Sequence, residues 1–105
     1  MDKVIQILKE IGLPFAYDHF AEGESPEPPF ICYLSPESNN FSADGKVYRK
    51  INRYHLEVYT DKKDRETEKK VEEVLNKYSI FYDRTEVWIE SEHLYEVLYY
   101  FEMEA

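Results

Sequence analysis

Apolar residues near the start of the chain recur at the spacing of an amphipathic helix. In MDKVIQILKEIG they fall at intervals of three and four residues, at Val4, Ile7, Leu8 and Ile11. This spacing places them on one face of a helix. Gly12 suits the position after a helix end, and Pro14 prevents the helix from continuing. The pattern therefore predicts a helix within residues 1–12 that buries one face.

Period-two alternation follows this helix. PFAYDHF predicts a short strand over 15–20, and the apolar run FICYL predicts a strand over 30–34 that is buried on both faces. Between them, AEGESPEPP over 21–29 is typical of a loop stiffened by its prolines. The loop serves either as a stiff connection or as a contact arm, and the sequence leaves both interpretations open.

A long polar segment precedes the longest predicted strand. SPESNNFSADG over 35–45 predicts a loop that turns at Asp44 and Gly45, and KVYRKINRYHLEVYT over 46–60 predicts a strand. The apolar residues of 46–51 have the opposite parity to those of 54–58. A change of buried face, a β-bulge or a strand start that projects beyond the sheet would each produce this pattern.

The second half of the chain predicts one helix and two strands. DKKDRETEKKVEEVLNKYS over 61–79 has a capping aspartate at 61 or 64 and an apolar stripe at Val71, Val74, Leu75 and Tyr78. Strands are predicted over 80–90 and 94–103, because apolar residues alternate with polar ones in both segments. In the last strand, alternation places five residues on one face: Tyr95, Val97, Tyr99, Phe101 and Met103.

These elements predict an α+β fold in the order α-β-β-β-α-β-β. Short connections favour hairpins, so we expect a largely antiparallel sheet with both helices packed on one face. A chain of 105 residues is the size of one domain, and we predict a single domain over residues 1–105.

The net charge of the chain limits the classes of molecule that it is expected to bind. The formal net charge is −9, whereas nucleic-acid binding requires a basic surface for phosphate contacts. Lysine and arginine are mixed with acids along the chain, which disfavours nucleic-acid binding and anionic membrane surfaces. No segment is long and apolar enough for a transmembrane span, and the N-terminus has no signal-peptide pattern. We therefore expect a soluble, cytoplasmic protein.

Candidate catalytic chemistry is sparse. The three histidines, His19, His55 and His93, lie far apart in sequence, and no HExxH or CxxC spacing is present. The only cysteine, Cys32, lies in the apolar run PPFICYL, where a buried thiol is expected. Paired glutamates are common on so acidic a chain. We therefore predict no catalytic residues, metal site or cofactor, and expect a protein that is not an enzyme.

Four phrases of the sequence carry a family resemblance: IGLPFAYDHF, PPFICYLSPESNNFSADGKVY, YHLEVYTDKKD and EVWIESEHLYEVLYYFEM. Together they resemble small tail-terminator or tail-completion proteins of long, non-contractile-tailed phages and prophages of low-GC Gram-positive bacteria. The resemblance covers nearly the whole chain. It implies an α+β structural protein that caps the tail tube and helps to join the tail to the head connector.

The resemblance also implies partners. They are further copies of the chain in a ring, often six-fold, together with the major tail-tube protein and the head-tail connector protein. The protein would act in the host cytoplasm during assembly and then at the head-tail junction of the virion. A non-catalytic, acidic protein-binding or regulatory module of the host cell is the alternative function.

A ring protein makes its contacts through exposed loops and strand ends. We therefore predict subunit or partner contacts in the polar loop and at the start of the long strand, at Glu37, Asn39, Asn40, Phe41, Asp44, Lys46, Tyr48 and Arg49. Phe41 is the apolar residue of this loop. It either anchors the loop to a partner or folds back over the core, and the sequence leaves both interpretations open.

Overall fold

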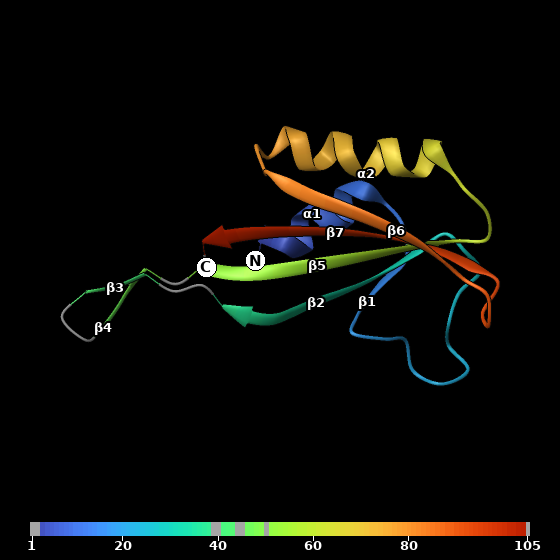
Figure 1. The fold of residues 1–105 in the computed structure, drawn as a ribbon, viewed down its shortest axis with the longest axis horizontal. Helices are drawn as coiled ribbons and strands as arrows, with labels where there is room; N and C mark the ends of the chain where they lie inside the picture. The colour runs from blue at the N-terminus through green and yellow to red at the C-terminus, as the bar shows by residue number, and fades with distance from the viewer. Residues whose placement is uncertain (1–2, 39–40, 44–45, 50, 105) are drawn as a thin grey trace.

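Two helices lie against one face of a five-stranded sheet in the computed structural model, and a two-stranded hairpin extends from one end (Figure 1). The structure describes residues 3–38, 41–43, 46–49 and 51–104, and the side chains among them outside 36–50. The α+β class, the element order and the mostly antiparallel sheet are as predicted.

Both helices follow the predicted apolar periodicity. Helix α1, Lys3–Ile11, buries all four predicted positions. Helix α2, Arg65–Lys77, buries Val71 and Leu75 and is shorter than the predicted 61–79. It begins where it does because the Asp64 side chain accepts a hydrogen bond from the Thr67 backbone N–H at 3.1 Å, which satisfies one of the free donors of the first turn.

The sheet has the strand order β1-β2-β5-β7-β6. Its members are β1 Phe15–Tyr17, β2 Phe30–Ser38, β5 Ile51–Thr60, β6 Tyr82–Ile89 and β7 Leu94–Glu104. Strands β2, β5, β7 and β6 pair antiparallel, whereas β1 pairs parallel to β2. The prediction that hairpins join the strands is therefore wrong for β1 and β2. Residues 18–29 instead carry the chain back, and parallel neighbours need a connection of about a dozen residues.

Strand β1 is shorter than the predicted 15–20. Asp18 has a φ of +66°, which is left-handed backbone and cannot continue a strand. Its N–H donates to the Tyr33 carbonyl at 2.8 Å, so the chain turns away while still joined to β2. One edge of the sheet is therefore only three residues long.

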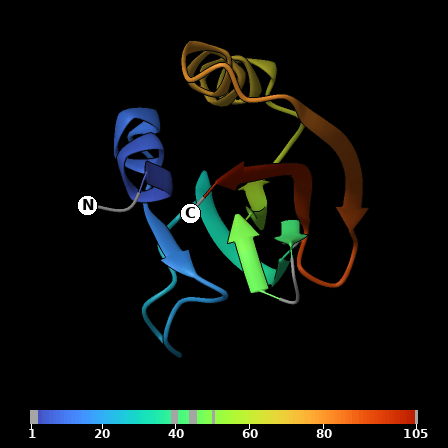
Figure 2. The same ribbon diagram turned by 90° about the vertical axis from the view of Figure 1, so that its left-hand side faces the viewer.

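Strand register decides which residues form the core. Leu56 of β5 faces Tyr99 of β7, Val58 faces Val97, and all four side chains are buried. They form one cluster with the apolar faces of α1 and α2, and Figure 2 shows both helices on this side of the sheet. The two helices also contact each other directly: the Lys77 ammonium group of α2 donates a hydrogen bond to the Glu10 carboxylate of α1 at 2.7 Å. The predicted packing of both helices on one face is confirmed.

The segment predicted as a loop over 35–45 is partly strand. Strand β2 continues to Ser38, which pairs with Asn52 of β5, and β3 Phe41–Ala43 pairs with β4 Lys46–Arg49. The predicted strand over 46–60 is divided between β4 and β5, which belong to different sheets. Of the three interpretations of its mixed parity, a projecting strand start fits best. The loop prediction failed because SPESNNFSADG lacks the apolar alternation that identifies a strand.

Replacing Thr60 tests the packing at the end of β5. Thr60 is 3% exposed, and its hydroxyl has no hydrogen-bond partner in the part of the chain that the structure describes. Thr60→Val keeps the branched shape and removes a buried, unsatisfied polar group, so we expect the free energy of unfolding to rise by about 1 kcal/mol. Urea denaturation measures this change. Thr60→Ser, which keeps the hydroxyl and loses the methyl group, is the control and should gain no stability. A loss of stability in Thr60→Val would contradict the interpretation.

Candidate functional site: a projecting hairpin and the exposed sheet face

The most distinctive feature of the molecule is a hairpin arm, formed by β3 and β4. Figure 1 shows the arm beyond the first residue of β5 and the last residue of β7. The arm gives the molecule a long axis of 49 Å against 30 and 25 Å for the other two. The register of pairing is irregular at two places near the arm, in β2 between Leu34 and Glu37 and inside the arm between Phe41 and Ser42. Such irregularities bend and twist a strand pair.

The arm contains or borders the contact residues predicted from the sequence. Glu37 lies in β2 opposite Arg53 of β5, and Phe41 of β3 lies opposite Arg49 of β4. Lys46 pairs with Ala43 in the same hairpin. Tyr48 also belongs to β4. Asn39, Asn40 and Asp44 lie outside the described residues. The Phe41 side chain is also outside the described part, so neither of its two predicted positions is tested.

The arm differs in charge from the rest of the chain. Residues 39–50 contain one aspartate, two lysines and one arginine, a net charge of +2, whereas the whole chain carries −9. The two strands of the arm hold Lys46 and Arg49 and no acid. A basic hairpin is attracted to acidic surfaces of other molecules. Two copies of the chain also repel each other less when the arm of one approaches the acidic body of the other than when two bodies meet.

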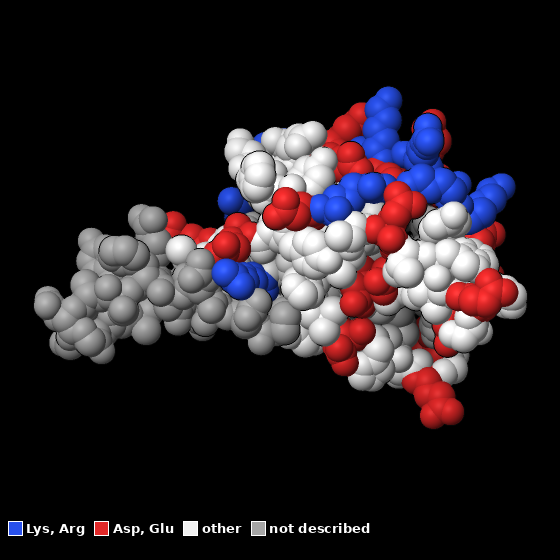
Figure 3. Space-filling view, in the orientation of Figure 1, with Lys and Arg blue, Asp and Glu red and all other residues white. Residues whose placement is uncertain are grey.

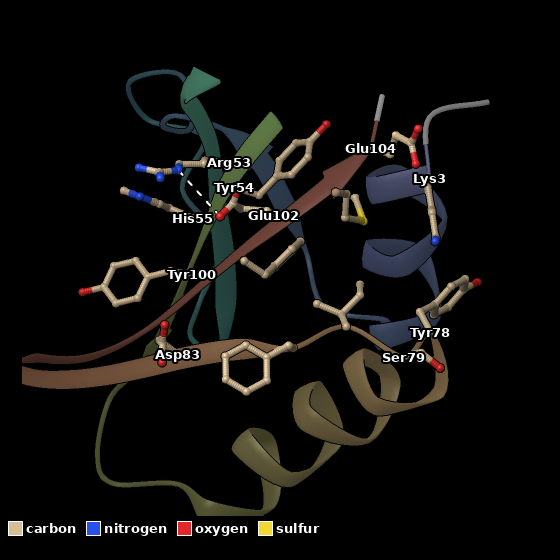
Figure 4. Close-up of a pocket in the computed structure, with 14 residues that line it drawn as sticks. Lys3, Arg53, Tyr54, His55, Tyr78, Ser79, Asp83, Tyr100, Glu102 and Glu104 are labelled. Atoms are coloured by element: carbon tan, nitrogen blue, oxygen red, sulfur yellow. Dashed lines mark ion pairs between the residues drawn. The ribbon is translucent and has the colours of Figure 1, made fainter. Parts of the chain in front are cut away.

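An open hollow of about 840 Å³ lies near the base of the arm. Figure 4 shows Arg53, His55 and Tyr100 at one side of it and Lys3 and Tyr78 at the other, with apolar side chains between them. Arg53 Nε lies 3.9 Å from Glu102 Oε1, and the His55 and Tyr100 rings meet edge to face at 5.2 Å. The lining mixes apolar and aromatic side chains with charged ones, a composition that suits contact with a protein surface.

The sheet face opposite the helices carries a pair of carboxylates. Glu57 of β5 and Glu96 of β7 lie on this face, because their neighbours in each strand point into the core. The Tyr59 hydroxyl lies 2.7 Å from Glu96 Oε2 and 3.2 Å from Glu57 Oε1, and it donates its one proton to this pair. Residues 18–29 reach over the β2 side of the face, where Phe20 packs edge to face on Phe30 at 5.5 Å.

This partly buried environment alters the acidity of its groups. Burial, followed by the charge of Glu96, raises the pKa of the Glu57 carboxyl. Burial also raises the pKa of the Cys32 thiol to about 11, with Glu57 as the next cause. The thiol is 6% exposed, as the sequence predicted, and it remains protonated at neutral pH. A protonated, covered thiol is a poor nucleophile.

A second charged network joins α2 to β6. The buried Glu68 carboxylate accepts hydrogen bonds from Arg84 and from Lys63, the latter at 2.8 Å. Both cations also reach Glu86, at 3.0 and 2.9 Å. Figure 3 shows lysine and arginine gathered over α2 and an acidic band down the middle of the visible face. We interpret the network as the attachment of α2 to the edge strand, because every buried charge in it is paired.

The histidines lie in three separate places. His19 is exposed beside Asp18, His55 packs on Tyr100, and His93 lies in the turn before β7 near Trp88, at 6.2 Å between ring centroids. Among the described residues, no three histidine, cysteine or carboxylate side chains are grouped closely enough to hold a metal ion. Within the same residues, neither helix is long and apolar enough to cross a membrane.

Sequence reasoning missed the exposed apolar residues along the β6 edge of the sheet. Phe81 is 86% exposed, and Val87 and Trp88 of β6 are 51% and 39% exposed. In the sequence they look like ordinary strand positions, because the alternation in FYDRTEVWIE does not indicate which face of the strand is buried. The signal that marks them is the position of β6 at the end of the strand order, with β7 as its one neighbour among the described residues. Topology rather than local pattern supplies this signal.

Comparisons with known proteins add no family. A comparison with models of protein families gives no match to this chain, and a comparison with curated proteins gives none either.

Removing the charge of Glu57 tests the carboxylate pair. The folded chain holds the Glu57 proton more tightly than the unfolded chain does, so ionisation lowers stability as the pH rises through the raised pKa. Glu57→Gln should therefore unfold at higher urea concentration than wild type near about pH 7.5, and the gain should vanish near about pH 4. The exposed Glu22→Gln is the control. A gain at both pH values, or a loss at neutral pH, would show that charge is not the cause.

Proposed function

We propose that this protein is a phage structural protein that caps the tail tube and helps to join the tail to the head connector. The hairpin arm is the observation that supports this most strongly. It extends from the end of the body, and within the described residues its strands β3 and β4 pair with each other and with no strand of the five-stranded sheet. Long connecting segments in compact domains are usually functional, and an arm that extends from the body is well placed to bind another protein.

The arm and the body are two different surfaces at opposite ends of the molecule (Figure 1), which is what a head-to-tail contact between copies requires. In such a contact the arm of each copy meets a different surface on the next copy, and the series closes into a ring when the rotation allows. The basic strands of the arm and the acidic body favour this arrangement electrostatically. The hollow near the base of the arm offers apolar walls for a neighbour or for the tail-tube protein.

The acidic balance of the chain also fits a junction that DNA crosses. Phosphate groups are repelled by a negative lining, so DNA passes such a channel without adhering to it. The carboxylates on the sheet face and the net charge of −9 are compatible with this role. The role requires complementary surfaces and no catalytic group.

Deleting the gene from its prophage tests the proposed function. After induction, we expect DNA-filled heads without tails, together with free tails of uncontrolled length, in electron micrographs. Supplying the intact gene from a plasmid should restore complete particles. Normal particles with tails of wild-type length after deletion would overturn the proposal and leave the regulatory module as the better interpretation.

Shortening the arm tests the observation that carries the proposal. Residues 39–51 are replaced by Asn-Gly, so that Ser38 and Asn52, which pair in the sheet, are joined by a two-residue loop of the type that hairpins favour. This variant should fold, with a thermal unfolding midpoint close to wild type, yet fail to restore particles to the deletion strain.

A matched control uses the other exposed loop. Glu24→Ala, in the connection between β1 and β2, leaves the arm intact and should restore particles fully. If the shortened variant folds and restores particles as well as wild type does, the arm is not the assembly contact.

A further inference from the structure

The sheet has two unequal edges, and only one of them is long. At the β1 edge the strand has three residues, while β6 runs over Tyr82–Ile89 and has only β7 as a neighbour within the described residues. The outer side of β6 thus presents a row of free backbone donors and acceptors, which is a template for another strand. Large exposed apolar side chains accompany it, at Phe81, Val87 and Trp88.

From this edge we infer that two copies of the chain pair through β6, antiparallel and centred on Thr85, to form one continuous ten-stranded sheet. A two-fold axis perpendicular to the sheet makes strands antiparallel and keeps the helices of both copies on the same face. It also requires residues of the same parity to face each other, so that only a few registers are possible.

Charge selects among those registers. A contact centred on Arg84 places two arginines against each other, one centred on Glu86 places two glutamates together, and one centred on Asp83 places two aspartates together. Like charges directly opposite in a sheet are destabilising. A contact centred on Val87 overlaps only residues 85–89 of each strand, which leaves most of the edge unpaired.

The Thr85 register brings opposite charges together. Arg84 then faces Glu86 of the second copy, and the symmetry repeats this pair on the other side of the axis. Within one copy, Arg84 and Glu86 already lie 3.0 Å apart, with 30% and 36% of their side chains exposed. Each therefore retains solvent-facing surface for a second partner. The charges that exclude the neighbouring registers favour this one.

Aromatic and apolar residues also match in this register. Tyr82 faces Trp88 of the second copy on the helix side of the sheet, and cross-strand aromatic pairs stabilise antiparallel sheets. On the opposite side, Thr85 faces its own copy across the axis, Asp83 faces Val87, and Phe81, the residue before the strand, comes next to Ile89. The strongly exposed Phe81 ring is thereby brought against an apolar partner, which accounts for its position beside the edge.

The pair is distinct from the contact proposed for a ring. A two-fold contact closes at two copies, whereas a ring needs a head-to-tail contact, and the pair uses β6 rather than the arm. It describes the free protein in solution, before assembly. Its test uses purified protein, so its failure and the failure of the proposed function are distinguishable.

A cysteine at position 85 tests the register directly. Facing Cα atoms in an antiparallel pair lie about 4.5–5.5 Å apart, within the range of about 4.4–6.8 Å for a disulfide. Oxidised Thr85→Cys should therefore run as a covalent dimer on non-reducing gels. Val87→Cys is the matched control, because two copies of residue 87 lie about four residues apart along the strands and do not reach each other. Wild type, whose Cys32 is buried, controls for the native thiol.

Sedimentation equilibrium supplies the second measurement, at physiological ionic strength and at about 1 μM to about 1 mM protein, a range that suits a small contact. Wild type should be a dimer at the upper end of this range. Thr85→Asp, which places two carboxylates on the axis, should weaken the dimer by about tenfold or more, while Thr85→Ser should not.

Three outcomes would overturn the inference. The first is a wild-type monomer throughout the concentration range. The second is a dimer that position 85 does not cross-link. The third is cross-linking at position 87 equal to that at position 85, because it would indicate random collision or another register.

Discussion

The antiparallel pairing of β5 with β7 determines the rest of the molecule. It continues without interruption from Ile51 opposite Glu104 to Thr60 opposite Tyr95, so the two strands share one alternation along their whole length. Leu56, Val58, Val97 and Tyr99 are thereby turned toward the helices and buried. A shift of one residue would expose this set and bury Glu57 and Glu96 beneath the helices. The register is therefore fixed by the free energy of burying one face.

The opposite face follows from the same register. Its carboxylates are held beside one another because the strand positions between core residues must point outward, and Tyr59 bridges them with its hydroxyl. At the β6 edge, Glu68 and Arg84 show the other way of placing charge near the core, as neighbours of opposite sign. The two carboxylates on the sheet face therefore repel each other, whereas Glu68 and Arg84 attract each other. Only the second pair helps to hold two elements together.

Sequence patterns predicted the elements with a covered face and failed where no face is covered. The apolar stripe of α1 and the alternation from Tyr54 onward were correct in residue and direction. Residues 35–45 were misassigned because SPESNNFSADG lacks apolar alternation, although β2 and β3 both run through it. The strand order, with β7 between β5 and β6, depends on pairing between distant segments, which local pattern does not contain. The hollow and the free edge depend on that order and could not be predicted either.

The inequality of the two sheet edges limits how far this fold can grow. A sheet with two long free edges can add copies at both, and successive addition leads to fibrils. Here the β1 side ends after three residues, where Asp18 turns the chain away. Within the described residues, a copy that joins through β6 occupies the longer edge and leaves the shorter one, which is β1 and the end of β2 beyond it. A contact through β6 therefore favours a closed pair of copies over continued growth of the sheet.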